Sequence, residues 1–177
     1  CWSLVGSEMC IRDSYNTFYG DSSASTIYSG GLNTIIGYKA GFFQTTAYDN
    51  VFIGAGAGGG TTTGTYNTVI GTRAGGWGSS SPNNSGTLPT GALGTDNTVI
   101  GTEAGMVMET GASDNVIIGE EAGQALTTGD DNVFIGEDAG FNSTTSSDNT
   151  FVGNNAGRQN TTGYRNCLLY TSDAADD

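Results

Sequence analysis

The sequence predicts an all-β protein, a parallel β-solenoid in which eight to nine coils of about 17 residues stack into a rod. Three observations lead to this prediction. An asparagine returns at a nearly constant spacing, a glycine follows it four residues later, and strand-forming residues lie between the two. Helices are excluded because each interior glycine would cost ~1 kcal/mol, and the chain of 177 residues contains 30 glycines.

The asparagine repeat sets the length of a coil. Successive asparagines are separated by 17, 17, 17, 30, 18, 17, 17 and 17 residues, and they are Asn16, Asn33, Asn50, Asn67, Asn97, Asn115, Asn132, Asn149 and Asn166. We number the positions of each coil from its asparagine. The fifth position is Gly in all eight complete coils, and seven of the eight carry Ala-Gly at the eighth and ninth positions.

Each coil is expected to contain short strands joined by tight turns. The second to fourth positions are mostly β-branched or aromatic and end at a glycine, which is typical of a strand. A second strand is expected through the Thr-Thr pair at the thirteenth and fourteenth positions. Glycines at the fifth, ninth and often the fifteenth positions supply the positive φ angles of the corners. Coils stacked at ~4.8 Å form a rod of roughly 40 Å.

Stacking also places equivalent residues in columns along the rod. The asparagines are expected to form a ladder of side-chain amides, as stacked Asn does in cross-β assemblies. We interpret this column as structural and assign it no ligand.

Alternation along a strand puts the third position on one face and the second and fourth on the other. The third position is apolar in every coil, and the other two are rich in Val, Ile and Thr. A narrow roll can bury only one of these faces, so the other would remain as an apolar stripe of the kind that marks an interface. We therefore expect association around a common axis, with a homotrimer as the preferred form. The alternative is a thick roll, or neighbouring loops, that covers both faces within a monomer.

The two ends of the chain do not follow the repeat. Residues 1–14 and 167–177 resemble translated sequencing-adapter scars, and we set them aside as non-native. The native part is then residues 15–166, an internal fragment of a longer chain. All three cysteines, at positions 1, 10 and 167, lie outside it, so disulfide and thiol–zinc interpretations do not apply to it.

The charge of residues 15–166 excludes several classes of partner. Four cations stand against 13 carboxylates, a net charge of −9, and the chain has no His. Such a chain repels phosphate backbones, so we expect no nucleic-acid partner. No stretch approaches the ~20 apolar residues of a membrane span, so any membrane attachment would depend on a C-terminal anchor beyond the fragment.

One candidate binding region is the 30-residue coil, which holds a 13-residue insertion within residues 75–96. Insertions in solenoids leave the rod as loops and often carry binding sites. Trp77, Asn83 and Asn84 could stack against and hydrogen-bond a sugar. The alternative is a tolerated surface excursion with Trp77 folded onto the rod.

Two sets of repeated side chains, acidic residues and threonines, allow further interpretations. A solvated surface is the simplest interpretation of the acidic residues Glu103, Glu120, Glu121, Glu137 and Asp138. The alternative is bridging by a hard cation, which prefers oxygen ligands. The Thr-Thr columns raise an ice-binding hypothesis, limited because adjacent threonines point to opposite faces.

A polysaccharide-degrading enzyme is a remote alternative. Catalysis needs an acid, a base or a metal-activated water in a cleft. The native part has no His or Cys, and its paired carboxylates repeat with the coil instead of forming a single pocket. We therefore expect no catalytic residues, no metal and no cofactor.

The segments NVFIGEDAG and NTVIGTEAG, together with the Thr-Thr-Gly of several coils, resemble the head repeats of trimeric autotransporter (YadA-like) adhesins. They are equally similar to repeats of phage tail fibres. The Asn–apolar–Ile–Gly core of those heads matches Asn50, Ile53 and Gly54, for example. The departures here are a longer coil, the Ala-Gly pair and the added Thr-Thr-Gly.

This resemblance implies a left-handed, trimeric β-roll that serves as the head or shaft of an adhesive fibre. It also implies an extracellular place on the bacterial surface or outer membrane, or on a virion tail for the alternative. The implied partner is a host surface protein, a glycan or a bacterial receptor.

Overall fold

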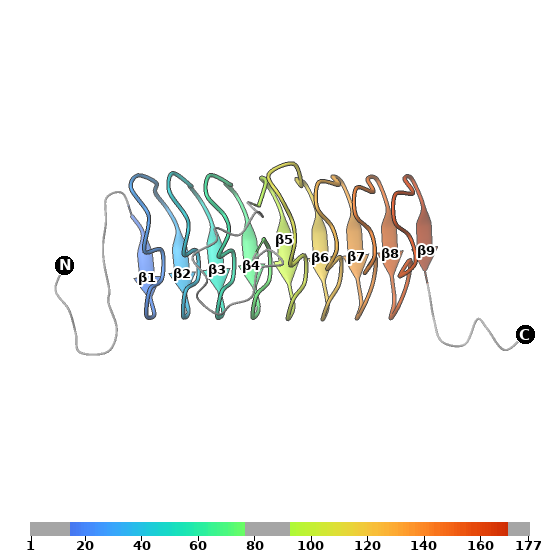
Figure 1. The fold of residues 1–177 in the computed structure, drawn as a ribbon, viewed down its shortest axis with the longest axis horizontal. Coiled ribbons are helices and arrows are strands. Elements are labelled where there is room, and N and C mark those ends of the chain that lie inside the picture. The colour runs from blue at the N-terminus through green and yellow to red at the C-terminus, as the bar shows by residue number, and fades with distance from the viewer. Residues whose placement is uncertain (1–14, 77–92, 170–177) are drawn as a thin grey trace, which may run out of the picture.

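The computed structural model describes residues 15–76 and 93–169, which form a parallel β-solenoid. Each coil contributes one three-residue strand, and the nine strands pair in chain order to make a single parallel sheet (Figure 1). The strands are β1 (Thr17–Tyr19), β2 (Thr34–Ile36), β3 (Val51–Ile53), β4 (Thr68–Ile70), β5 (Thr98–Ile100), β6 (Val116–Ile118), β7 (Val133–Ile135), β8 (Thr150–Val152) and β9 (Cys167–Leu169). The predicted fold class is confirmed.

The register of the sheet is the same at every pair of strands, including those on either side of the irregular coils. Thr68 pairs with Thr98 across the 30-residue spacing, and Thr98 pairs with Val116 across the 18-residue spacing. The additional residues are therefore taken up outside the sheet. Because equivalent positions stay aligned, every column of the repeat runs the whole length of the sheet.

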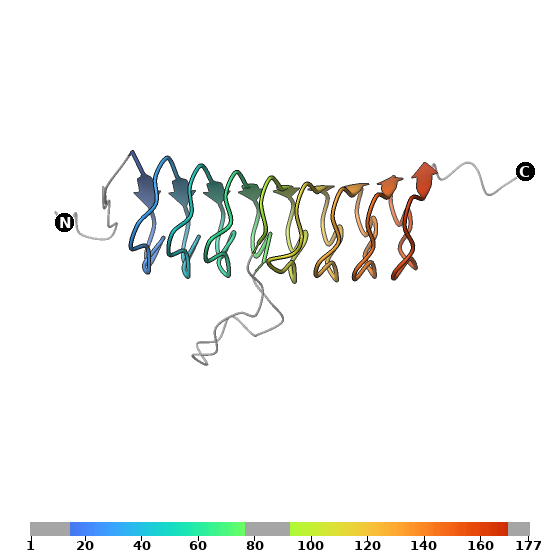
Figure 2. The ribbon, with the colours of Figure 1, turned by 90° about the horizontal axis from the view of Figure 1, so that it is seen from above.

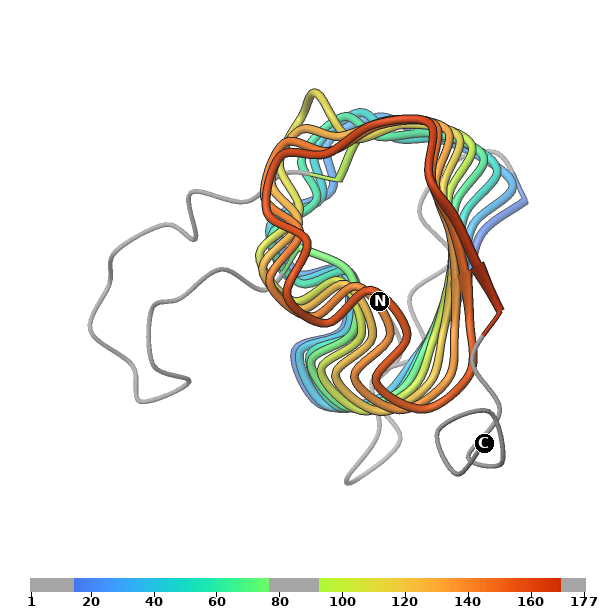
Figure 3. The same ribbon diagram turned by 90° about the vertical axis from the view of Figure 1, so that its right-hand side faces the viewer.

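All strands lie along one side of the rod, and the rest of each coil closes a loop behind them (Figures 2 and 3). The loop turns through positive φ angles at the fifth, seventh, ninth and seventeenth positions. At the fifth position φ lies between 126° and 140°. A Cβ there would stand 2.2–2.6 Å from the carbonyl oxygen of the next coil's fifth glycine, from Gly20 to Gly136. Both constraints require glycine, which explains why the fifth position is glycine in all eight complete coils.

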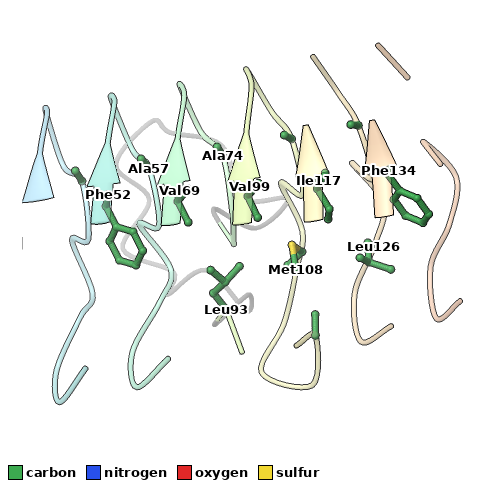
Figure 4. Close-up of a cluster of buried hydrophobic side chains, with 14 of the residues drawn as sticks. Phe52, Ala57, Val69, Ala74, Leu93, Val99, Met108, Ile117, Leu126 and Phe134 are labelled. Atoms are coloured by element: carbon green, nitrogen blue, oxygen red, sulfur yellow. The ribbon is translucent and has the colours of Figure 1, made fainter. Parts of the chain in front are cut away.

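The core is built from columns of side chains inside the coils (Figure 4). The third position supplies one column, with every member at most 2% exposed: Phe18, Ile35, Phe52, Val69, Val99, Ile117, Phe134 and Phe151. A second column comes from the alanines of the eighth position. The rings of Phe134 and Phe151 stack with their centroids 5.1 Å apart. The alternation of the strand has thus placed its third residue inside and its second and fourth outside.

The predicted second strand through the Thr-Thr pair is wrong. Those residues form a bend in the described coils, and each pair of coils shares isolated hydrogen bonds there instead of a ladder. The N–H of Thr127 donates to the carbonyl of Thr144 at 2.8 Å, and the hydroxyl of Thr127 donates to the same oxygen at 3.0 Å. The chain changes direction at this point, so no extended segment is long enough to pair as a strand.

The sheet extends beyond Asn166 into the segment that we expect to be non-native. Strand β9 pairs with β8, but all three of its side chains are exposed. Any extended residues that follow Asn166 could form this pairing, because it uses backbone groups alone. None of the described residues forms a helix able to cross a membrane.

Candidate functional surface

The asparagine column is a continuous ladder inside the rod, as predicted. From Asn33 to Asn166, each backbone N–H donates to the Oδ1 atom of the preceding asparagine at 2.9–3.1 Å. From Asn16 to Asn149, each Nδ2 donates at 2.8–2.9 Å to the carbonyl of the residue three before the next asparagine, which is the fifteenth position in the regular coils. The side chain therefore ties one coil to the next and closes its own coil. From Asn16 to Asn149 these asparagines are at most 4% exposed, so the column is structural and not a surface for ligands.

The second and fourth positions of the strands form a flat surface on the outside of the rod, which we call the outer face. From β2 to β8 its side chains are only partly covered. It consists of Thr17 and Tyr19 of β1 together with Thr34, Ile36, Val51, Ile53, Thr68, Ile70, Thr98, Ile100, Val116, Ile118, Val133, Ile135, Thr150 and Val152. The turns of the described coils lie behind the sheet and leave this face uncovered (Figure 2). The described residues thus leave uncovered an unbroken, uncharged array of side chains, all β-branched from β2 to β8.

Two columns of turn residues border the outer face. The leading border is formed by the residues that directly precede each asparagine, which is the seventeenth position of the preceding regular coil. The trailing border is formed by the sixth and seventh positions, which follow the strand. Along β6 to β8 the leading border carries Asp114, Asp131 and Asp148, all exposed. The trailing border carries pairs of acids on the coils of β6 and β7: Glu120, Glu121, Glu137 and Asp138.

Charge is divided unevenly along the rod. Residues 15–76 contain two carboxylates and two cations, whereas residues 93–169 contain 11 carboxylates and two cations. The first half instead carries exposed aromatic side chains, with Tyr15, Tyr19, Tyr28, Tyr38, Tyr48 and Tyr66 all at least 45% exposed. The Nζ of Lys39 lies 5.3 Å from the ring centroid of Tyr38 in this half. One half of the rod is therefore neutral and aromatic, and the other is strongly acidic.

The acidic residues singled out from the sequence are partly neutralised within the chain. Glu103 forms an ion pair with Arg73 of the preceding coil and accepts a hydrogen bond from Gln124 at 3.0 Å. Asp138 lies 3.3 Å from the Nε of Arg158. Within the described coils, no three His, Cys, Asp or Glu side chains gather closely enough to hold a metal ion. The cation-bridging hypothesis gains no geometric support from these residues.

The described residues stop at Gly76 and resume at Leu93, which is 1% exposed in the core. Trp77, Asn83 and Asn84 lie outside the described residues, so the sugar-binding hypothesis stays a prediction. The extra residue of the next coil falls within Glu109–Ala112, and Ala112 lies against Gly94, which follows Leu93.

The two threonines of each Thr-Thr pair differ in exposure, as expected from their alternation. The fourteenth position is exposed, as at Thr128, and the thirteenth is partly covered. The hydroxyls of Thr45, Thr127 and Thr144 donate to carbonyl oxygens of the next coil at 3.0–3.1 Å. Only one column of each pair is left free for water, and ice binding itself stays untested.

A column of interior residues at the twelfth position escaped the sequence analysis. It is buried in every coil where it is described before the last, with Ile27, Gln44, Thr61, Met108, Leu126 and Ser143. Its members share no chemistry, so no consensus letter marked the position. A residue-by-residue count of apolar side chains would not have found it either, because Gln44, Thr61 and Ser143 are polar.

Comparison of the chain with protein-family models, with curated proteins and with solved structures finds no match. The arrangement that the residues support by themselves is a parallel β-solenoid of about 17-residue coils, in which the described coils leave one sheet face uncovered.

Proposed function

We propose that this chain is a segment of a self-associating extracellular fibre whose copies pack through their outer faces. The fibre would serve attachment, as the head or shaft of a bacterial surface adhesin or of a phage tail fibre. The observation that carries the proposal is the uncovered outer face, which continues without a charged residue over β1 to β8. A contiguous apolar surface of this kind marks an interaction site in a soluble protein.

The size of the face favours an assembly with more than one interface per copy. Eight strands at ~4.8 Å give a length of ~40 Å, and the two columns of side chains give an area of only ~400 Å². A stable interface buries about 800 Å² on each partner. Three copies around a common axis would bury the face and both of its borders, which is why a homotrimer remains the preferred form.

Attachment is supported by the architecture and by the sequence resemblance to adhesin heads and tail-fibre repeats. The Asn column and the uniform register make a rigid rod, and rigid rods suit the display of binding loops away from a surface. The receptor would be a host protein, a glycan or a bacterial surface component, contacted by the insertion or by the exposed tyrosines. The proposal includes no catalytic step.

The test is to measure the molar mass of the full chain by sedimentation velocity, with substitutions that separate the two faces of the strand. Ile53→Asn and Ile118→Asn change the outer face. They are expected to keep the circular dichroism spectrum of the fold and to reduce the associated species to monomer. Thr128→Asn, on the exposed bend, is the matched control and is expected to leave association unchanged.

Two results would count against the proposal. One is a wild-type chain that is folded and monomeric at all concentrations, and the other is association that the outer-face variants leave intact. The interior substitution Ile117→Asn checks the assignment of faces, because a polar group at that buried position should unfold the chain.

A further inference from the structure

We infer that the outer face closes against a second copy first along β1 to β4, and that the half from β5 to β8 closes only when salt screens its acidic borders. This inference rests on the proposed self-association. It concerns which part of the face associates readily and what controls the rest.

Cyclic symmetry determines which residues meet. When copies surround an axis parallel to the rod with their outer faces inward, the leading border of one copy approaches the trailing border of its neighbour. Equivalent coils lie at the same height, so each residue of one border faces the residues that follow the same strand in the neighbour. The uniform register keeps this correspondence along the whole sheet.

In the acidic half, this arrangement brings like charges together. At the height of β6, Asp114 would face Glu120 and Glu121 of the neighbouring copy, and at β7 Asp131 would face Glu137 and Asp138. Of these carboxylates only Asp138 has an ion-pair partner among the described residues. The others are exposed or partly exposed on the two borders.

The neutral half lacks this conflict. At β2 the leading residue Leu32 would face Tyr38 and Lys39, and at β4 Tyr66 would face Thr72 and Arg73. Both leading residues are large, apolar or aromatic, and more than half exposed at 56% and 60%. Aromatic side chains and cations over their faces are favourable at protein interfaces. This half can therefore pack without bringing two carboxylates together.

Salt acts on the two halves differently. The screening length falls from ~30 Å at 0.01 M to ~8 Å at 0.15 M salt. At low salt, each carboxylate of the acidic half is repelled by several others on the neighbouring copy. At physiological salt and above, only the nearest carboxylates interact, and the apolar contacts of the outer face dominate.

The experiment is sedimentation equilibrium of the full chain in 0.01, 0.15 and 0.5 M potassium chloride. The association constant of the wild-type chain is expected to rise by at least tenfold across this series. The variant Asp114→Asn/Glu121→Gln/Asp131→Asn should associate at 0.01 M nearly as tightly as the wild type does at 0.5 M. Its fold should persist, because Asn tolerates the positive φ of 57–58° found at both aspartates and Gln has the shape of Glu.

The matched control is Asp49→Asn, which removes a charge from the same border in the neutral half. It is expected to keep the salt dependence of the wild type. Association that is independent of salt, or that weakens as salt rises, would overturn this inference and leave the proposed function standing. The absence of association at every salt concentration would overturn the proposed function and this inference with it.

Discussion

Removing one amide from the middle of the asparagine ladder should be far more damaging than removing the amide at its end. In Asn115→Ala the lost Nδ2 no longer donates to Asn97 or to the carbonyl of Gly129, at 3.0 and 2.9 Å. The lost Oδ1 no longer accepts from the backbone N–H and the Nδ2 of Asn132, both at 3.0 Å. Asn115 and Asn132 are fully buried, so water cannot replace these partners.

The magnitude follows from the groups left without partners. The N–H of Asn132 and the carbonyl of Gly129 each lose the side-chain partner described above. An unsatisfied buried group costs about 1–3 kcal/mol, so the substitution should lower the free energy of unfolding by ~2–6 kcal/mol. Asn166→Ala is the matched control: its side chain is exposed, and it should cost less than ~1 kcal/mol.

Urea unfolding followed by far-ultraviolet circular dichroism compares the two variants. Long repeat arrays can unfold in more than one step. Hydrogen exchange of the amides of β6 and β7 therefore shows whether the loss of stability lies in the coils on either side of the substitution. Asn115→Ala is expected to speed exchange in these strands. If both variants unfold at the same urea concentration, the ladder does not hold the coils together and the reasoning fails.

Three further substitutions test other columns by the same unfolding assay. Gly119→Ala should lower the free energy of unfolding by ~3 kcal/mol or more, because its Cβ would lie 2.3 Å from the carbonyl oxygen of Gly136 at a φ of 139°. The control Gly111→Ala should lower it by less than ~1 kcal/mol. Equal losses of stability would contradict the argument. Gln44→Leu should raise the free energy of unfolding by about 1 kcal/mol, because the buried Oε1 of Gln44 has no hydrogen-bond partner among the described residues. A loss of stability in this variant would refute the prediction. Phe134→Ala should cost about 3–5 kcal/mol by opening a cavity, and a cost below ~1 kcal/mol would show that the site collapses.

The ninth position shows how far a column tolerates exceptions. It is Gly in seven coils with φ of 54–63°, but Ala24 occupies it in the first coil with φ 45°. The left-handed conformation costs a residue with a Cβ only about 1–2 kcal/mol, and at the ninth-position glycines a Cβ would approach side-chain atoms and not the backbone of the next coil. At the fifth position the next coil's carbonyl does block a Cβ, which is why the sequence allows alanine at one glycine column and not at the other.

Much of the candidate surface was predictable as well. The alternation of the strand predicted that one apolar set would remain outside, and the outer face is that set. The borders were not anticipated as a pair, because each coil was counted from its asparagine and the residue that precedes the strand then belongs to the preceding coil. Their common role appears only when Asp114 and Glu121 are seen to flank the same strand, β6.

The sequence by itself determined the coil length, the position of the strand within the coil and the asparagine ladder, because each depends on a period that the letters display. Only the tertiary structure decided which face of the strand is interior, that the Thr-Thr pair bends, and that Gln44 and Leu126 share one buried column. These outcomes depend on the direction in which the chain turns after the fifth glycine. That direction is set by backbone angles and by contacts between coils. It cannot be read from the repeating residue types at the strand, the Thr-Thr pair or the twelfth position.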